Sequence, residues 1–227
     1  MKKNYILLLV LLFVTNSFSY CQTKHTNCNC PKSDYFNPVI LSKPDSEFHF
    51  KNGNTIVLCG DRNEDTVPNT FTDFILAVCG ADTVIDYWDE EDGINLIQRS
   101  GDSLFIEDIT ILPTGQNLDF KPTLWTTDQI YFQGLKVLKK LVVNRQIPKY
   151  DKREIQIALK LFESAKGELN DSTMDIAEKL FIATISGSKI ARKYFKEFKN
   201  KFGELDGAYA EQYEDLTAMI ELWDIKK

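Results

Sequence analysis

The chain has 227 residues, of which 43% are hydrophobic and 26% charged, and its formal net charge is −6 at pH 7. This composition excludes a disordered polypeptide, a collagen-like rod and a multi-pass membrane protein. The acidic balance also argues against nucleic acid as a partner.

The first 21 residues have the parts of a secretory signal peptide. Lys2 and Lys3 form a positively charged start, and an apolar run from Ile6 to Val14 follows. This run is too short to span a hydrocarbon core of about 30 Å, so we expect cleavage after Cys21 and an exported protein of the periplasm or the extracellular space.

In an alternative interpretation, Cys21 carries a lipid at the start of a lipoprotein, which would attach the protein peripherally to a membrane. Tyr20 argues against it, because lipoprotein signals usually place a small residue before the lipidated cysteine. No later segment reaches the length of a membrane helix, so we expect no transmembrane span.

Four cysteines remain once Cys21 is set aside, and exported thiols tend to pair. A bridge between Cys28 and Cys30 would close a very tight ring. Two patterns are left that cross from the tail, residues 22–45, to Cys59 and Cys79. A single Cys59–Cys79 bridge is a further alternative. A zinc site would usually show two C-x2-C pairs, which this chain lacks.

Residues 46–147 have the pattern of antiparallel β structure. Asn52-Gly53 between apolar runs predicts a tight hairpin, and Gly80, Gly101 and Gly134 mark further turns. The predicted strands are 48–51, 55–59, 71–79, 83–88, 94–98, 104–112, 124–132 and 135–143. The last of these also fits a helix. We expect a meander that closes as a sandwich or a small barrel.

Residues 148–227 have an apolar period of about 3.6 after Pro148, which predicts helices. Four apolar stripes begin at Ile155, Ile176, Ile190 and Tyr209. The predicted fold class is therefore α+β, an N-terminal antiparallel β meander followed by a C-terminal bundle of about four helices. The third helix has a basic outer face, which we interpret as solvated: Lys189, Arg192, Lys193, Lys196, Lys199 and Lys201.

The densest negative charge lies at residues 86–93. Its carboxylates offer a weak calcium site, the only cofactor that the sequence suggests: Asp86, Asp89, Glu90 and Asp92. An EF-hand loop does not fit, because Trp88 and Arg99 occupy positions that require acids. Tyr87 and Trp88 offer flat faces on which a sugar could stack. The simpler interpretation is a solvated acidic turn.

The sequence contains no complete catalytic motif. His25 and His49 are the only histidines, and no Walker loop, H-E-x-x-H or G-x-S-x-G is present. Ser186 and Lys189 fit S-x-x-K, but the S-D-N and K-T-G elements that accompany it are absent. No catalytic residue is therefore predicted.

Several short motifs together resemble a family of small exported proteins of Bacteroidota-type bacteria, to which no activity is attached. They are the Cys-x-Cys-Pro tail, 52–60 with its Asn-Gly turn, Val78-Cys79-Gly80, Trp125-Thr126-Thr127, Val143-Asn144-Arg145-Gln146-Ile147 and 182–188. The resemblance implies export and a β-then-α layout, and it assigns no catalytic residue.

Two functions are compatible with these features. The first is an exported cell-envelope or secreted binding module without enzymatic activity, whose partner is another envelope protein or a glycan. The second is a periplasmic hydrolase that uses carboxylates, with or without calcium.

Overall fold

The computed structural model describes residues 28–31, 43–62, 70–81, 83–88, 94–166 and 170–225. The predicted signal peptide, including Cys21, lies outside the described residues, as do Asp89, Glu90 and Asp92. In the described part of the chain, no helix has the length and apolar character needed to cross a bilayer.

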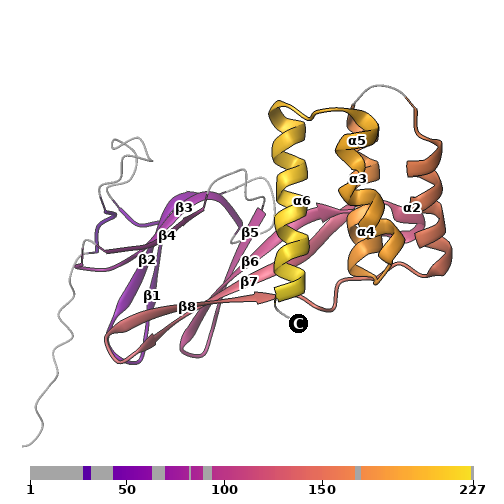
Figure 1. Cartoon of the computed structure of the whole chain (residues 1–227). Helices are drawn as coiled ribbons and strands as arrows, with labels where there is room; N and C mark the ends of the chain where they lie inside the picture. Colours follow the sequence, from indigo (N-terminus) through magenta and orange to yellow (C-terminus); the bar gives the residue numbers. More distant parts are fainter. Residues whose placement is uncertain are drawn as a thin grey trace, which may run out of the picture.

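Eight antiparallel strands form the N-terminal part of the fold (Figure 1). They are β1 Ser46–His49, β2 Thr55–Arg62, β3 Thr70–Val78, β4 Thr83–Trp88, β5 Ile94–Ser100, β6 Ser103–Leu112, β7 Lys121–Gln133 and β8 Lys136–Val143. A short 3-10 helix, Gln116–Leu118, lies between β6 and β7. The predicted hairpins are confirmed, and residues 136–143, which also fitted a helix, form a strand.

The sheet is open and sandwich-like, because β1 and β8 are not paired with each other among the described strands. The division into two layers begins in β3. Its Thr70 and Phe71 pair with β5, whereas its later residues pair with β4. One layer is therefore β1–β4 and the other β5–β8, so the small barrel is not formed.

The two β layers enclose one hydrophobic core. Its buried residues come from both layers: Phe50, Ile56, Leu58, Phe71, Phe74, Leu76, Trp88, Ile97, Leu104, Ile106 and Ile130. The layers also meet at their hairpin ends, where the Phe50 and Phe132 rings are 4.9 Å apart and Asn52 Nδ2 donates to the Gly134 carbonyl.

Two disulfides attach the tail to the outer face of β2 and β3. Cys28 pairs with Cys79 and Cys30 with Cys59, so the pairing is nested and the single Cys59–Cys79 bridge is not formed. The cysteines pack with Val57 and Ala77 in a small apolar cluster of their own. The predicted link between tail and sheet is confirmed.

The helices are α2 Lys152–Ser164, α3 Asp171–Ile185, α4 Lys189–Lys196, α5 Phe198–Phe202 and α6 Gly207–Ile225. The third predicted helix is thus divided into α4 and α5. Glu197 interrupts it with φ −87° and ψ 1°. This break keeps Phe198 and Phe202 against Phe162, whose ring centroid is 5.9 Å from that of Phe202.

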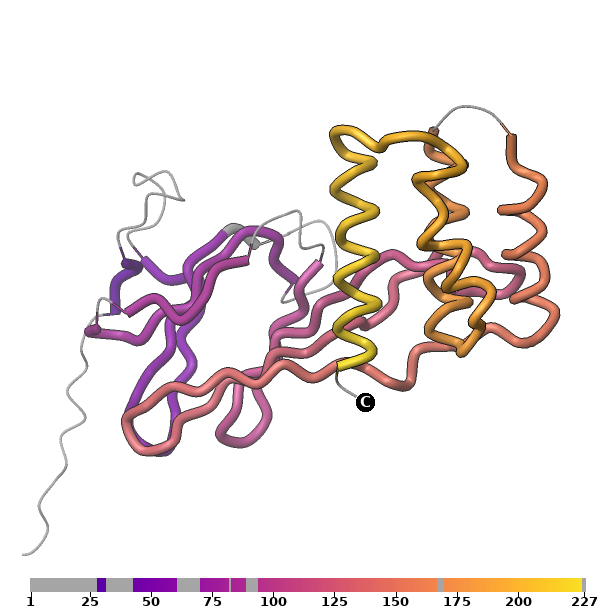
Figure 2. The backbone as a smooth tube through the Cα atoms, in the orientation of Figure 1, coloured from indigo at the N-terminus to yellow at the C-terminus, as the bar shows by residue number. Residues whose placement is uncertain are grey.

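The helices pack on the far ends of the long strands β6, β7 and β8 (Figure 2). Trp125 of β7 makes the central contact, because its ring lies 5.6 Å from that of Phe181 and 5.9 Å from that of Trp223. The same strands therefore contribute to two hydrophobic cores, one between the β layers and one beneath the helices.

Candidate functional site

A row of polar side chains crosses three strands between the two cores. Asn95 of β5 lies opposite Asp108 of β6, and Asp108 lies opposite Thr126 of β7. Residues directly opposite in an antiparallel pair point to the same face of the sheet, so these three side chains are neighbours. They share that face with Ile97 and Ile106 of the β core.

A β-bulge positions one end of this row. Asp108 pairs with Thr126 but Ile109 pairs with Leu124, which leaves Trp125 as the extra residue of β7. A bulge changes which way neighbouring side chains point. Here Trp125 enters the helical core while Thr126 donates to Asp108 Oδ2 at 3.1 Å.

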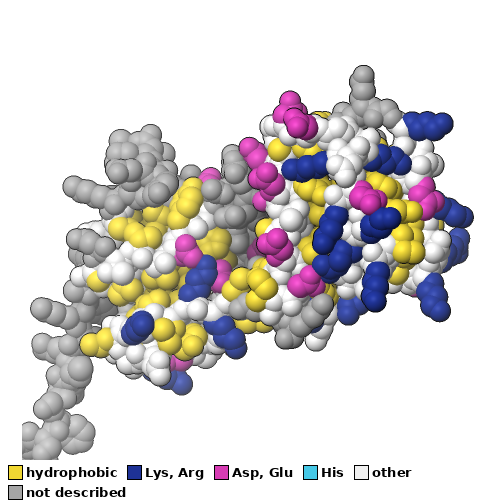
Figure 3. Space-filling view, viewed as in Figure 1, with side chains coloured by type: hydrophobic (Ala, Val, Ile, Leu, Met, Phe, Trp, Pro, Cys, Tyr) yellow, Lys and Arg dark blue, Asp and Glu magenta, His cyan; other side chains and the backbone are white. Residues whose placement is uncertain are grey.

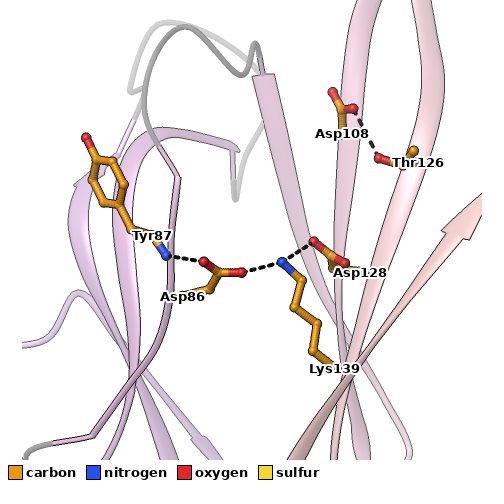
Figure 4. A network of polar contacts seen from close by, with 6 residues as sticks. All are labelled: Asp86, Tyr87, Asp108, Thr126, Asp128 and Lys139. Atoms are coloured by element: carbon orange, nitrogen blue, oxygen red, sulfur yellow. Dashed lines mark hydrogen bonds and ion pairs between the residues drawn. The ribbon is translucent and has the colours of Figure 1, made fainter. Parts of the chain in front are cut away.

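Lys139 of β8 links Asp128, which lies beside this row, to Asp86 in the opposite β layer (Figure 4). Its ammonium pairs with Asp128 of β7 at 2.9 Å and with Asp86 of β4. It also lies 4.8 Å from the centroid of the Trp88 ring. The Lys139 charge is therefore shared between two carboxylates and an aromatic face.

Burial changes the proton affinity of both partners in this ion pair. The pKa of Asp128 is raised above its ordinary value, mainly because burial disfavours the carboxylate, and Lys139 only partly offsets this. Burial alone would lower the pKa of Lys139, but its hydrogen bonds to Asp86 and Asp128 and their negative charges raise it. Lys139 therefore stays protonated.

These residues line a cleft of about 250 Å³: Tyr87, Trp88, Asn95, Ile106, Asp108, Thr126, Asp128 and Lys139. Three buried atoms in it have no hydrogen-bond partner among the described residues, namely Nδ2 and Oδ1 of Asn95 and Oδ1 of Asp128. Asn95 is 1% exposed, so bulk water does not compensate. Buried polar groups are normally bonded, so these atoms indicate a place for a polar ligand.

The structure changes the assignment of the predicted site residues. Trp88, predicted as a flat face for a sugar, lines the cleft, but it is only 7% exposed and stacks on Phe74 with ring centroids 4.7 Å apart. Tyr87 is partly buried, and its ring points away from the Lys139 ammonium (Figure 4). Asp86 pairs with Lys139, which supplies the positive charge beside it.

No group of three or more side chains suited to a metal is found in the described part of the chain. Of the four residues predicted to hold calcium, only Asp86 falls within that part. The calcium site therefore stays a prediction.

The sequence analysis did not identify Asn95, Asp108, Asp128 or Lys139 as site residues. The strand pattern held a signal for Asn95 and Asp128. Their strands alternate between buried and more exposed positions, and each of the two polar residues lies two positions before a buried isoleucine, Ile97 or Ile130. A polar residue at an inward position of a strand is the pattern to search for.

Searches against protein-family models, curated proteins and solved structures found no match to this chain. The candidate site therefore rests on its geometry and chemistry alone.

Proposed function

We propose that the protein is an exported binding module and that its cleft binds a small, neutral, hydroxyl-rich ligand, such as one sugar residue of a glycan. The observation that carries the proposal is the set of atoms on Asn95 and Asp128 that have no hydrogen-bond partner in the described part of the chain. The two disulfides support export, because disulfides persist mainly in oxidising compartments.

The hydrogen-bonding capacity of the cleft favours hydroxyl groups. The Asn95 amide offers two donor hydrogens and an acceptor oxygen, and Asp128 Oδ1 offers an acceptor. A ligand that satisfies both residues has to donate and accept within a small volume. A hydroxyl group does both, and a sugar carries several of them side by side.

The charge of the cleft argues against an anionic ligand. Among the described residues in and beside the cleft, Asp86, Asp108 and Asp128 bring three carboxyl groups near the ammonium of Lys139. With all of them ionised the cluster is negative, so a phosphate or a carboxylate would be repelled. The volume of 250 Å³ lies just below the range of about 300–1,000 Å³ usual for ligand pockets, which suits a single sugar residue.

A hydrolase is the second candidate, and one observation favours it. Asp108 and Asp128 line the same cleft, and the raised pKa of Asp128 is the property of a general acid. Glycoside hydrolases use two carboxyl groups in different protonation states.

Calorimetric titration of the mature protein with neutral monosaccharides and N-acetylated sugars tests the proposal. We expect saturable binding that N95L and D128N weaken about tenfold or more, since N95L removes the amide and D128N replaces a charged acceptor by a neutral one. D119N is the matched control, because Asp119 is exposed and does not line the cleft.

The proposal fails if no sugar binds, or if D119N weakens binding as much as D128N does. Release of reducing sugar from oligosaccharides, abolished by D128N, would instead support the hydrolase.

A further inference from the structure

A second, larger groove lies in the helical part, away from the cleft that we propose to bind a sugar, called the sugar cleft below. It encloses about 800 Å³ between the α3–α4 turn, the end of α6 and the segment that follows β8. Its lining is basic: Arg145, Lys149, Lys189 and Arg192 contribute four positive charges, and Asp224 contributes one negative charge. Figure 3 shows Lys and Arg side chains gathered over the helical part of the molecule.

The two arginines are held in place by α6. Arg192 makes a bidentate pair with Asp224, with N–O distances of 2.7 and 3.2 Å. Arg145 donates to the Trp223 carbonyl at 2.6 Å and lies 4.1 Å from the centroid of the Trp223 ring. These contacts fix the shape of the groove and neutralise one of its four positive charges.

Three positive charges are left over, those of Arg145 and of the two lysines. Lys149 and Lys189 are exposed, and neither forms an ion pair with a residue that the structure describes. Lys149 comes from the segment before α2, and Lys189 from the start of α4. An anion placed in the groove would be attracted by both.

The start of α4 also points toward this groove. Ser188 caps the helix by accepting from Ala191 N. The N–H groups of Lys189 and Ile190 belong to the first turn and have no acceptor within an α-helix. Such N–H groups, together with the helix dipole, favour an anion.

Thr184 provides an observation that is independent of the helix end. It lines the groove and is 3% exposed, and its Oγ1 has no hydrogen-bond partner among the described residues. A buried hydroxyl without a partner costs free energy, so a group in the groove that bonded to Thr184 would remove that cost.

We propose that this groove binds a phosphate monoester, with the phosphoryl group held by Lys149, Lys189, the first turn of α4 and the Thr184 hydroxyl. The groove is much larger than a bare phosphate, so the ligand carries an organic part, which packs beside Ile185 and Trp223. The charge of this groove is opposite to that of the sugar cleft, so the two sites select different ligands.

Thermal unfolding of the mature protein tests the site directly. We expect inorganic phosphate and glucose 6-phosphate to raise the melting temperature more than sodium chloride of equal ionic strength, and glucose 6-phosphate to act at lower concentration. K149A, K189A and T184V should each weaken phosphate binding about tenfold or more. T184V keeps the size of the side chain, so a loss of binding there does not come from misfolding.

K196A is the matched control, because Lys196 lies exposed on α4 but does not line the groove. The proposal is overturned if chloride stabilises the wild-type protein as well as phosphate does, or if K196A weakens binding as much as K189A does.

Vesicles separate the two sources of a phosphate monoester. Phosphatidylcholine vesicles that contain phosphatidic acid should bind the protein if the ligand is a lipid headgroup. Binding of glucose 6-phosphate without binding to these vesicles identifies a soluble ligand, and binding to neither overturns the proposal.

Discussion

Replacement of Asn95 by Leu should stabilise the protein while weakening ligand binding. Both polar atoms of the Asn95 side chain are buried without partners among the residues that the structure describes. Burial of an amide without hydrogen bonds costs about 1–3 kcal/mol in protein mutational data. Leucine has the same branching at Cγ and removes this cost, so N95L should raise the free energy of unfolding by about 1–3 kcal/mol. Urea unfolding followed by circular dichroism measures the change.

The same substitution at Asn144 is the matched control. Asn144 Nδ2 donates to the Leu124 carbonyl at 2.9 Å, and its Oδ1 accepts from Gln146 N at 3.0 Å. N144L leaves both partners unsatisfied and should destabilise the protein by about 1–3 kcal/mol. If N95L is also destabilising, the Asn95 amide is bonded in the unliganded protein, and the reasoning behind the sugar cleft is refuted.

Three further predictions concern stability. The C28S/C79S double variant should lower the free energy of unfolding by about 3 kcal/mol, because the nested Cys30–Cys59 bridge already shortens the loop that Cys28–Cys79 closes. Urea unfolding of the oxidised protein measures the change, and an unchanged midpoint would show that the bridge is not formed. Burial raises the pKa of Glu178 to about 7, so up to roughly 3 kcal/mol of stability present below pH 4.5 is lost as the pH rises through 7. E178Q should flatten that part of the pH profile of unfolding, and a profile identical to wild type would contradict the assignment. In G60A the new methyl group would collide with the Asp73 carbonyl and with Phe74 across the β2–β3 pair. This substitution should lower the free energy of unfolding by about 1–3 kcal/mol, measured by thermal unfolding. An unchanged stability would refute the close approach of the two strands.

The sequence predicted those parts of the fold that depend on local chemistry. Asn52-Gly53 placed the first hairpin, because its turn requires residues that tolerate positive φ, and Gly53 has φ 84°. The apolar stripes predicted the helices, because a period of about 3.6 residues places apolar side chains on one face of a helix. The break at Glu197 was missed, because it depends on the fit of Phe198 and Phe202 against a distant helix.

The sequence pattern did not determine which strands pair with one another. Nothing in β3 alone indicates that its two ends pair with different strands and so start two layers. The burial of Trp88 was not predicted, because alternation places Tyr87 and Trp88 on opposite faces without saying which face is buried. The polar row depends on the register of three strands, which brings together Asn95, Asp108 and Thr126. The sequence pattern did not predict this register.

The side-chain amide of Asn95 offers the most direct test of the proposed function. Its two Nδ2–H signals in a nitrogen-15 correlation spectrum are identified by their loss in N95L. Titration with the sugar that binds most tightly in calorimetry should shift these signals and saturate at the calorimetric affinity, because the amide is expected to bond to the ligand. Signals that stay unmoved while the sugar binds would place the ligand elsewhere and contradict the account of the cleft.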